Sequence, residues 1–418
     1  MKKILIISHL PISKETNVGK TLYNLFCNYP KSCLFQVFFT LEGIVFDCKS
    51  SFYISDHDVL KSFLHHTKNC GRVFDYNEEC KADNNKASLI RLNKRSSLSL
   101  LLRDFCWKKS NYFNKGFSDW INSIQPDLVF LAPGYSRFPY QMAKSVCEKL
   151  RIPLYTYYME DFYDAKHFTI SPLFWFRLSL FRRTVRKNID CSSKLFALNE
   201  GLALHYAYTF KKEFKILFNP SLEVFPPAHF SKEKVVLVYA GSINRSREFA
   251  INKIGETIVK NKLNGFAEFI VCGPCQTQKI MDRIIGNSGI SYKGYLDSVS
   301  LYEEIKKADV VVHVESFKSK NVAKTKLALS TKIPEYLVSN RIILAIGPSS
   351  IESVRYLSEN KCAFVICKKN MIENQIIHLL NNLSDYAYLT ENAMKLAEKN
   401  HSIDCIQEKL YKEIDNDD

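Results

Sequence analysis

The chain has 418 residues, which is too long for one ordinary hydrophobic core and predicts two domains. With 46% hydrophobic residues, 14 glycines and 13 prolines, the composition is that of a globular protein and excludes a disordered chain. The formal net charge of +15 favours an anionic partner, which could be nucleic acid, an anionic membrane surface or a phosphorylated small molecule.

The cysteines and the N-terminus both point to a cytoplasmic protein. The thirteen cysteines are scattered, odd in number and set in apolar stretches such as Phe26-Cys27, so we expect reduced, buried thiols. The first residues, MKKILIISHLP, hold an apolar run about half as long as a secretory h-region with its cleavage site, and we interpret it as a buried strand. No apolar run approaches the roughly 18 residues of a membrane span.

Short β-branched segments alternate with amphipathic stretches such as Leu301–Lys307 along the whole chain. This alternation predicts parallel strands with helical crossovers, because strands buried on both faces are apolar almost throughout. The expected strands are Lys3–Ser8, Asp127–Leu131, Leu154–Tyr158, Leu195–Leu198, Val235–Tyr239, Glu268–Val271, Val310–Val314, Ile342–Ile346 and Ala363–Ile366. The fold class is therefore α/β of the doubly wound kind.

A segment marked by prolines divides the chain near its middle. Pro220 and Pro226-Pro227 interrupt the alternation, and KVVLVYAGSIN then restarts the strand-then-glycine pattern of the N-terminus. We expect two Rossmann-like domains that face each other across a cleft. We place the first domain in residues 1–222, the second in residues 223–395, and in residues 396–418 a C-terminal helix that could pack back on the first domain.

Three short motifs have both a functional and a structural interpretation. Cys272–Cys275 (CGPC) has the spacing of a thioredoxin redox motif, but its glycine is better explained as the turn that ends a strand. Gly19–Thr21 matches the end of a P-loop, although Lys14 stands where a Walker A sequence needs glycine. Asp56–Asp58 (DHD) could bind a metal, but we interpret it as a capped helix start and expect no metal site.

The second half of the chain carries the most specific signals. A strand ends at Gly241, Arg245 and Arg247 follow it, and TKIPEYLVSNRIILAIGP begins at Thr331. This succession resembles the C-terminal, donor-binding half of GT-B glycosyltransferases, above all the GT4-like enzymes of bacterial polysaccharide and lipopolysaccharide assembly. The resemblance implies the GT-B fold, with Gly241 in the donor site and Glu335 against the donor ribose.

Carboxylate chemistry suits this role, because a carboxylate accepts two hydrogen bonds and can hold both ribose hydroxyls. The alternative is that Glu335 is simply an acid near a helix start. Arg245, Arg247 and Lys332 would lie near the donor pyrophosphate, with solvated surface cations as the alternative. The resemblance is incomplete, because the E-x7-E spacing of the family places another glutamate where this chain has Leu327.

The first half resembles the same enzymes less specifically. Ser8–Lys20 is similar to their first strand and loop, in which Gly19 would face a phosphate with its backbone. Tyr158–Asp161 (YMED) is similar to the loop that carries an acidic pair. Glu160 or Asp161 is therefore the candidate for deprotonating or orienting the acceptor hydroxyl, and a helix cap is the alternative for Asp161.

The segment Ser171–Lys187 (SPLFWFRLSLFRRTVRK) has five cations, no acid and a bulky apolar side. Such a helix suits the interface of an anionic membrane, and the alternative is a core helix with a basic outer face. The residues expected to face the membrane are Trp175, Phe176, Arg177, Arg182 and Arg183. We do not expect nucleic acid as a partner, because no zinc-finger spacing, RNP motif or helix-turn-helix signature accompanies the cations.

Together these features predict a glycosyltransferase that moves a hexosyl or related group from a nucleotide diphosphate sugar to a hydroxyl of a saccharide or lipid-linked acceptor. The resemblance implies a retaining, metal-independent reaction in cell-surface polysaccharide synthesis, at the inner face of the cell membrane, with the nucleotide sugar as co-substrate and no cofactor. A sugar-nucleotide epimerase of the same fold and a non-catalytic nucleotide-sugar-binding scaffold remain open alternatives. The base, the sugar, the acceptor and the linkage depend on pocket shape, which no short motif encodes.

Overall fold

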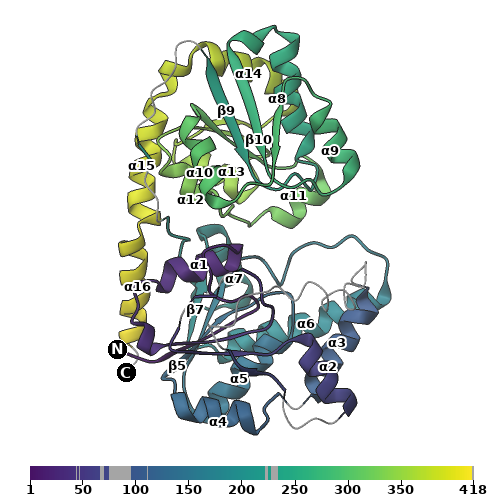
Figure 1. Cartoon of the computed structure of the whole chain (residues 1–418), viewed down its shortest axis with the longest axis vertical. Coiled ribbons are helices and arrows are strands. Elements are labelled where there is room, and N and C mark those ends of the chain that lie inside the picture. Colours follow the sequence, from purple (N-terminus) through teal and green to yellow (C-terminus); the bar gives the residue numbers. More distant parts are fainter. Residues whose placement is uncertain are drawn as a thin grey trace. The chain divides into compact units, whose positions relative to one another are not determined.

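The computed structural model describes residues 1–43, 45–46, 48–65, 70–74, 96–110, 112–221, 225–226 and 234–416. The chain forms two compact units (Figure 1). Unit 1 contains Met1–Asp164, Phe168–Phe218 and Gln407–Asp418, and unit 2 contains Ala165–His167 and Asn219–Ile406. The division near the middle of the chain thus falls between Phe218 and Asn219, while the sequence-predicted boundary at residues 222 and 223 lies outside the described residues.

Unit 1 is built on an eight-stranded sheet in the order β4-β3-β2-β1-β5-β6-β7-β8, in which only β4 runs antiparallel to its neighbour. The strands are β1 (Ile4–Ser8), β2 (Leu34–Phe38), β3 (Ser50–Tyr53), β4 (Arg72–Val73), β5 (Leu128–Ala132), β6 (Leu154–Tyr158), β7 (Lys194–Ala197) and β8 (Lys215–Ile216). The helices are α1 (Asn17–Phe26), α2 (Asp56–His65), α3 (Ser97–Lys109), α4 (Lys115–Ile124), α5 (Phe138–Leu150), α6 (Pro172–Cys191), α7 (Glu200–Phe210) and most of α16 (Ile403–Asp415). The central strands β1, β2, β5 and β6 are buried at every residue, as helices on both faces require.

Unit 2 is built on a six-stranded parallel sheet in the order β11-β10-β9-β12-β13-β14. The strands are β9 (Val235–Ala240), β10 (Ala267–Cys272), β11 (Ser291–Gly294), β12 (Val310–Val314), β13 (Ile342–Ile346) and β14 (Phe364–Ile366). The helices are α8 (Glu248–Lys260), α9 (Gln278–Ile285), α10 (Ser298–Lys307), α11 (Ser319–Thr325), α12 (Ile333–Leu337), α13 (Glu352–Glu359), α14 (Ile372–Asn381) and α15 (Tyr388–His401). Single 3-10 turns are Lys31–Cys33, Leu263–Gly265, Lys369–Met371 and Leu383–Tyr386.

Both sheets are doubly wound, which confirms the α/β prediction. In unit 1 the chain builds outward from β1 in one direction and then returns to place β5 on the other side of β1. In unit 2 it does the same around β9, with β12 on the return. At such a reversal the loops at the carboxyl ends of the two strands diverge and leave a crevice, which is where ligands bind in open α/β sheets.

The C-terminal helix α16 belongs to unit 1 and lies against α1 (Figure 1). The side-chain amide of Gln407 donates to the carbonyl oxygen of Asn24 at 2.8 Å, and the hydroxyl of Tyr411 donates to that of Leu25 at 3.1 Å. The segment 396–418, expected as one helix, is therefore shared between α15 of unit 2 and α16, with Ser402 between them.

Buried His401, the last residue of α15, bonds to Asn219, the first residue of the main segment of unit 2. Its Nδ1 is 2.8 Å from the carbonyl oxygen of Asn219, so Nδ1 carries the proton and donates it. Its Nε2 then accepts from the hydroxyl of Tyr356 at 3.0 Å. Ser221 pairs with Ser402 in an isolated parallel bridge, which joins the segment after Asn219 to the residue that follows α15.

Two buried histidines make the stability of unit 2 depend on pH. Burial lowers the pKa of His401 and of His313 on β12 from 6.5 to about 4. The unfolded chain therefore takes up protons on both residues near pH 6.5, whereas the folded chain stays neutral there until about pH 4. We expect the contribution of the two neutral histidines to the free energy of unfolding to be complete above pH 6.5 and to decrease as the pH falls from 6.5 to about 4.

Urea unfolding followed by circular dichroism at several pH values measures this dependence. The variant His401→Gln should show a shallower fall with pH, whatever its absolute stability, because one of the two titrating groups is gone. An unfolding midpoint that stays constant across the window in the unaltered chain would contradict the assignment.

Candidate functional site

In unit 2, the candidate site lies at the carboxyl ends of β9 and β12, where the strand order reverses. Gly241 begins the loop after β9, and Glu315 follows β12 directly. The buried Tyr336 of α12 donates its hydroxyl to the carbonyl oxygen of Ala240 at 3.1 Å and accepts from the amide of the same residue at 3.3 Å. These two bonds fasten α12 to the end of β9, so Glu335 lies at this edge of the sheet.

Glu335 is largely buried there and pairs with Lys332. The Nζ of Lys332 lies 3.2 Å from Oε2 of Glu335, whose side chain is 17% exposed. Lys332 therefore orients the carboxylate rather than standing as an isolated cation. A carboxylate has about four lone-pair sites, so the contact with Lys332 does not by itself prevent Glu335 from accepting hydrogen bonds from hydroxyls.

Arg247 and Glu315 form a buried ion pair that joins the two loops. Nη2 of Arg247 donates to both carboxylate oxygens, at 3.0 and 3.1 Å, and the Glu315 side chain is 5% exposed. Burial alone would lower the pKa of Arg247, but the Glu315 carboxylate raises it above its ordinary value. His313 is 3.5 Å from Glu315 and remains neutral at pH 7, since burial lowers the pKa of His313 to about 4. Arg247 thus carries a charge that Glu315 offsets.

Arg245 differs from Arg247, because its side chain is exposed. Its backbone has φ 51°, and Ser246 follows with φ 66°. The side-chain amide of Asn321 on α11 donates to the carbonyl oxygen of Arg245 and to Oγ of Ser316, the latter at 3.1 Å. Consecutive left-handed residues that are not glycine are costly, and such strain clusters at ligand-binding loops. The loop after β9 therefore presents one exposed arginine, Arg245, and one partly buried arginine, Arg247.

At the CGPC motif, Cys272–Cys275, the backbone of Gly273 lies close to the backbone of Gly241. Gly273 has φ 142°, and a Cβ there would lie 1.9 Å from the carbonyl oxygen of Gly241. The next helix begins only at Gln278, and burial raises the pKa of Cys272 to about 11. A redox cysteine needs a lowered pKa, so the structure supports the turn interpretation of this motif.

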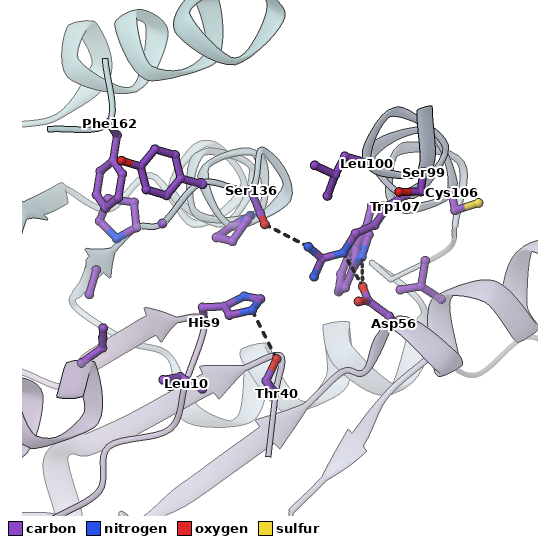
Figure 2. Close-up of a pocket in the computed structure, with 18 of the residues that line it drawn as sticks. His9, Leu10, Thr40, Asp56, Ser99, Leu100, Cys106, Trp107, Ser136 and Phe162 are labelled. Atoms are coloured by element: carbon purple, nitrogen blue, oxygen red, sulfur yellow. Dashed lines mark hydrogen bonds and ion pairs between the residues drawn. The ribbon is translucent and has the colours of Figure 1, made fainter. Parts of the chain in front are cut away.

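In unit 1, a cavity of about 750 Å³ opens at the carboxyl ends of β1, β2, β5 and β6 (Figure 2). It includes the reversal point between β1 and β5 and has the size of a typical small-molecule site. The strand ends contribute His9, Thr40, Gly134 and Glu160, and α2 and α3 contribute Asp56, Leu60, Arg103 and Trp107.

On one wall of the cavity, hydrogen-bonded polar side chains pack against aromatic rings. Nε of Arg103 and Nε1 of Trp107 both donate to Oδ1 of Asp56 at 2.8 Å. The guanidinium of Arg103 also donates to Oγ of Ser136 at 3.1 Å and lies 4.9 Å from the ring centre of Phe138. Figure 2 shows Asp56 and Trp107 together on this wall. The network fixes Arg103 at the rim of the cavity, although Asp56 offsets its charge.

His9 and Thr40 line another part of the same cavity, with Nε2 of His9 3.3 Å from Oγ1 of Thr40 (Figure 2). Neither His9 nor Arg103 is among the site residues expected from the sequence. For His9 a signal exists, since it is the residue directly after the first buried strand. For Arg103 none exists, because α3 reaches the cavity through its packing against α2, α5 and α6, which the sequence around Arg103 does not show.

Neither a model of a known protein family nor a curated protein sequence matches this chain. Solved structures do match it. The crystal structure of HepE from Anabaena in complex with UDP and glucose superposes with a TM-score of 0.63 at 11% identity, covering 99% of this chain and 100% of that one. Sucrose-phosphate synthase from Thermosynechococcus elongatus gives a TM-score of 0.62 at 11% identity, with 99% of both chains covered.

A third structure, WaaG, described as a glycosyltransferase involved in lipopolysaccharide biosynthesis, gives a TM-score of 0.59 at 12% identity. That match covers 97% of this chain and 98% of WaaG. The chain has the GT-B fold. The fold that the resemblance in the second half implies is therefore confirmed, and identities this low establish the fold alone.

Gly19 lies in the first turn of α1 of this GT-B fold, where backbone N–H groups have no partner within the helix. A Cβ on Gly19 would lie 2.2 Å from Oγ1 of Thr16 and 2.5 Å from the carbonyl oxygen of Pro11. Close packing thus explains the glycine, and its contact with a phosphate remains a prediction.

Of the two acids after β6, Glu160 and not Asp161 lines the unit 1 cavity. Oδ1 of Asp161 accepts from the amides of Tyr163 at 3.1 Å and Asp164 at 2.8 Å, and from the hydroxyl of Tyr206 at 3.1 Å. Burial raises the pKa of Asp161, and its three bonds stabilise a turn. The residue is not a helix cap, because the next helix, α6, begins at Pro172 and has Ser171 as its N-cap. Glu160 is exposed and lines the unit 1 cavity.

The DHD motif starts α2. Oγ of Ser55 accepts from the amide of Asp58 at 3.1 Å, and the Asp58 carboxylate accepts from the amide of Ser55 at 2.9 Å. Asp56 is held by Arg103 and Trp107, as described above. The capped helix start is therefore confirmed, and in the described part of the chain no group of three His, Cys, Asp or Glu side chains is placed to hold a metal ion.

The basic aromatic segment forms the helix α6, in which one arginine, Arg177, does not point outward as the sequence predicts. Trp175 and Phe176 are exposed. Arg177, however, is turned inward, with a side chain that is 14% exposed and 4.0 Å from the buried Asp104 of α3, and its Nη2 donates to the carbonyl oxygen of Tyr135 at 3.1 Å. Arg177 therefore does not face a membrane. Among the described helices none is long and apolar enough to cross a bilayer.

Proposed function

We propose that this protein is a glycosyltransferase that moves a sugar from a nucleotide diphosphate sugar to a hydroxyl group of an acceptor. The observation that carries the proposal is the position of Glu335 in a chain with the GT-B fold. Helix α12 holds Glu335 at the carboxyl end of β9, next to the loop that carries Arg245 and Arg247. The HepE structure holds UDP and glucose, which supports a nucleotide sugar as the donor of a chain with this fold.

In the proposed donor site, Glu335 accepts hydrogen bonds from the ribose hydroxyls. Arg245 adds positive charge where the diphosphate departs, and charge that develops in the transition state is stabilised best by groups that are already in place. Arg247 and Lys332 contribute less, because Glu315 and Glu335 offset their charges. Glu315 in turn is occupied by Arg247 and does not stand in for the family acid at Leu327.

The acceptor binds in the unit 1 cavity in this proposal. Glu160 and His9 both line the cavity, and a carboxylate or a neutral imidazole can accept or orient a hydroxyl proton. The reaction is retaining and independent of metal or cofactor, with cationic side chains as the groups that stabilise the leaving diphosphate. We place it in cell-surface polysaccharide synthesis, with a saccharide or lipid-linked acceptor at the inner face of the cell membrane.

A thermal-shift screen of nucleoside diphosphates and their sugars tests the donor site. At about one hundred times its Kd, a ligand stabilises the folded state by about 2.7 kcal/mol. For units of this size each 1 kcal/mol raises the melting temperature by about 2–4 °C, so the expected shift is about 5–11 °C. We expect one nucleoside diphosphate to produce this shift and the matching nucleoside, which lacks the phosphates, to produce none. Absence of a shift with every diphosphate would contradict the proposal.

Turnover separates the transferase from the two alternatives. The identified nucleotide sugar should remain unchanged when incubated with the protein alone and should lose its sugar when acceptor is added. Conversion of the donor without acceptor would indicate an epimerase. Binding without turnover in any acceptor mixture would indicate a scaffold.

A further inference from the structure

Unit 1 has a second cavity, about 490 Å³ in volume, along the outer side of α6. It shares no lining residue with the cavity of Figure 2. Its lining includes Trp175, Ser179, Arg182, Arg183 and Arg186 of α6, which recur at the spacing of one helix face, together with Tyr163. We call this feature the α6 groove. Its lining holds three arginines and no acid, so it is a cationic site.

Tyr163 orients two of the three arginines. Nε of Arg182 donates to the carbonyl oxygen of Tyr163 at 2.7 Å, and Nη2 of Arg186 donates to its hydroxyl at 2.8 Å. Both guanidinium groups also lie over the ring of Tyr163, at 5.5 and 5.7 Å from its centre. Planar forks that are ordered in advance bind phosphate oxygens with a smaller loss of side-chain entropy.

The charge of the α6 groove is only partly offset. Asp164 lies 4.0 Å from Nη2 of Arg182 and only 3.0 Å from Nε2 of His205, with which it shares a hydrogen bond. Arg183 is exposed and has no hydrogen bond or ion pair with the residues that the structure describes. The groove therefore keeps a net positive charge beside its fixed arginines.

Large apolar side chains are exposed next to this charge, where the chain enters α6. They are Phe168, Ile170, Leu173, Trp175 and Phe176. Exposed apolar residues are ordinary when they are scattered, but a group within nine consecutive residues beside a cationic groove indicates an amphiphilic partner. Tryptophan and phenylalanine beside arginine are the composition of a helix that lies in a bilayer interface.

We propose that the α6 groove binds the phosphate group of an anionic bilayer lipid, while Trp175 and Phe176 enter the interface beside it. A soluble phosphate would use the arginines but leave the apolar group in water, so the two features together favour a lipid. The site lies outside the donor loops and outside the unit 1 cavity, and the proposal goes beyond glycosyl transfer. The proposal also gives Arg182, Arg183 and Arg186 a ligand, whereas Arg177 points inward and is not part of the groove.

The fluorescence of Trp175 gives a direct signal. Trp107 and Trp120 are 1% and 6% exposed, whereas Trp175 is 43% exposed and is the third of the three tryptophans. Vesicles of phosphatidylglycerol and phosphatidylcholine should shift the emission to shorter wavelength, and the shift should be absent in Trp175→Phe. Pure phosphatidylcholine vesicles should give no shift. An unchanged emission with the anionic vesicles would overturn the proposal.

Charge-matched variants test the groove itself. Arg182→Gln, Arg183→Gln and Arg186→Gln combined should lower partitioning onto anionic vesicles by roughly a hundredfold, because each cation near the surface contributes about 1 kcal/mol. The control combines Lys395→Gln, Lys399→Gln and Lys409→Gln, which removes the same charge from exposed positions on α15 and α16 and should leave partitioning nearly unchanged. Equal losses in both variants would mean that net charge alone binds the membrane and would overturn the groove.

Two further measurements keep the result interpretable. Arg183→Glu alone should also weaken partitioning, and it disturbs no contact of Tyr163, so a folding defect of the triple variant cannot explain both results. Calorimetry with inorganic phosphate should show no tight binding, since tight binding of the free anion would overturn the lipid assignment. The thermal shift by the nucleoside diphosphate should persist in every variant, so failure of the donor site and failure of the groove are distinguishable.

Discussion

Replacement of Glu335 with alanine should lower the affinity for the nucleoside diphosphate by about two orders of magnitude. The change removes a charged acceptor of two hydrogen bonds, each of which contributes about 1.5 kcal/mol or more, and about 1.4 kcal/mol corresponds to a factor of ten. The helix should remain in place, because Tyr336, and not Glu335, fastens α12 to β9. Isothermal calorimetry with the diphosphate identified by the thermal-shift screen measures the effect.

Graded and matched variants define what Glu335 contributes. Glu335→Gln keeps one acceptor oxygen and should give an intermediate loss. Glu359→Ala removes an equivalent carboxylate from an exposed position on α13, where it pairs with Arg355 at 3.7 Å, and should leave the affinity unchanged. A loss of less than tenfold in Glu335→Ala would remove Glu335 from the ribose site and, with it, the main support for the donor geometry.

The second large effect is expected for Gly273→Ala, which should destabilise unit 2 by at least about 4 kcal/mol. The new Cβ would lie 1.9 Å from the carbonyl oxygen of Gly241, and the backbone at φ 142° is one that a residue with a side chain rarely adopts. The carbonyl oxygen of Gly241 and the Cα that would carry the new Cβ both belong to the backbone directly after β9 and β10, so the clash cannot be relieved by a side-chain movement. Because folded domains are stable by only about 5–15 kcal/mol, much of this margin would be lost.

Urea unfolding followed by circular dichroism gives the loss, with Gly265→Ala as the control. A Cβ at Gly265 would meet no atom within 4 Å, so that variant should unfold at nearly the same urea concentration as the unaltered chain. Equal stability of Gly273→Ala and Gly265→Ala would show that the backbones of Gly241 and Gly273 are not held in contact.

The strands that the sequence predicts well are those that are buried on both faces. Leu154–Tyr158, Val310–Val314 and Ile342–Ile346 match β6, β12 and β13 residue for residue, since short runs rich in aromatic, β-branched and aliphatic residues are typical of strands buried on both faces. The missed strand β2 contains Gln36, which is fully buried. Its side chain accepts from the amide of Ile12 and donates to the carbonyl of a loop residue, partners that only the folded chain brings near. β11 is missed because it is a half-exposed edge strand with little apolar character.

In the candidate site too, residues within one contiguous motif can be predicted from the sequence, whereas contacts between distant segments cannot. Glu335 is predictable, because the motif around it is contiguous in the sequence. The pair of Arg247 and Glu315 is not, since 68 residues separate them and they meet only because β9 and β12 are neighbours in the sheet. The sequence places Arg177 on the outer side of α6, because composition shows only that the helix is basic and aromatic. The pairing with Asp104 on α3, which composition does not show, turns Arg177 inward.

The return of α16 to unit 1 has a consequence for synthesis on the ribosome. Translation completes residues 219–406 of unit 2 before it reaches Gln407 and Tyr411, the side chains that bond to the carbonyl oxygens of Asn24 and Leu25 at the end of α1. The first unit to begin emerging is thus the last to acquire all its parts, the reverse of the usual N-terminal-first order. Unit 1 is therefore completed only when α16 docks onto α1, after residues 219–406 have been translated.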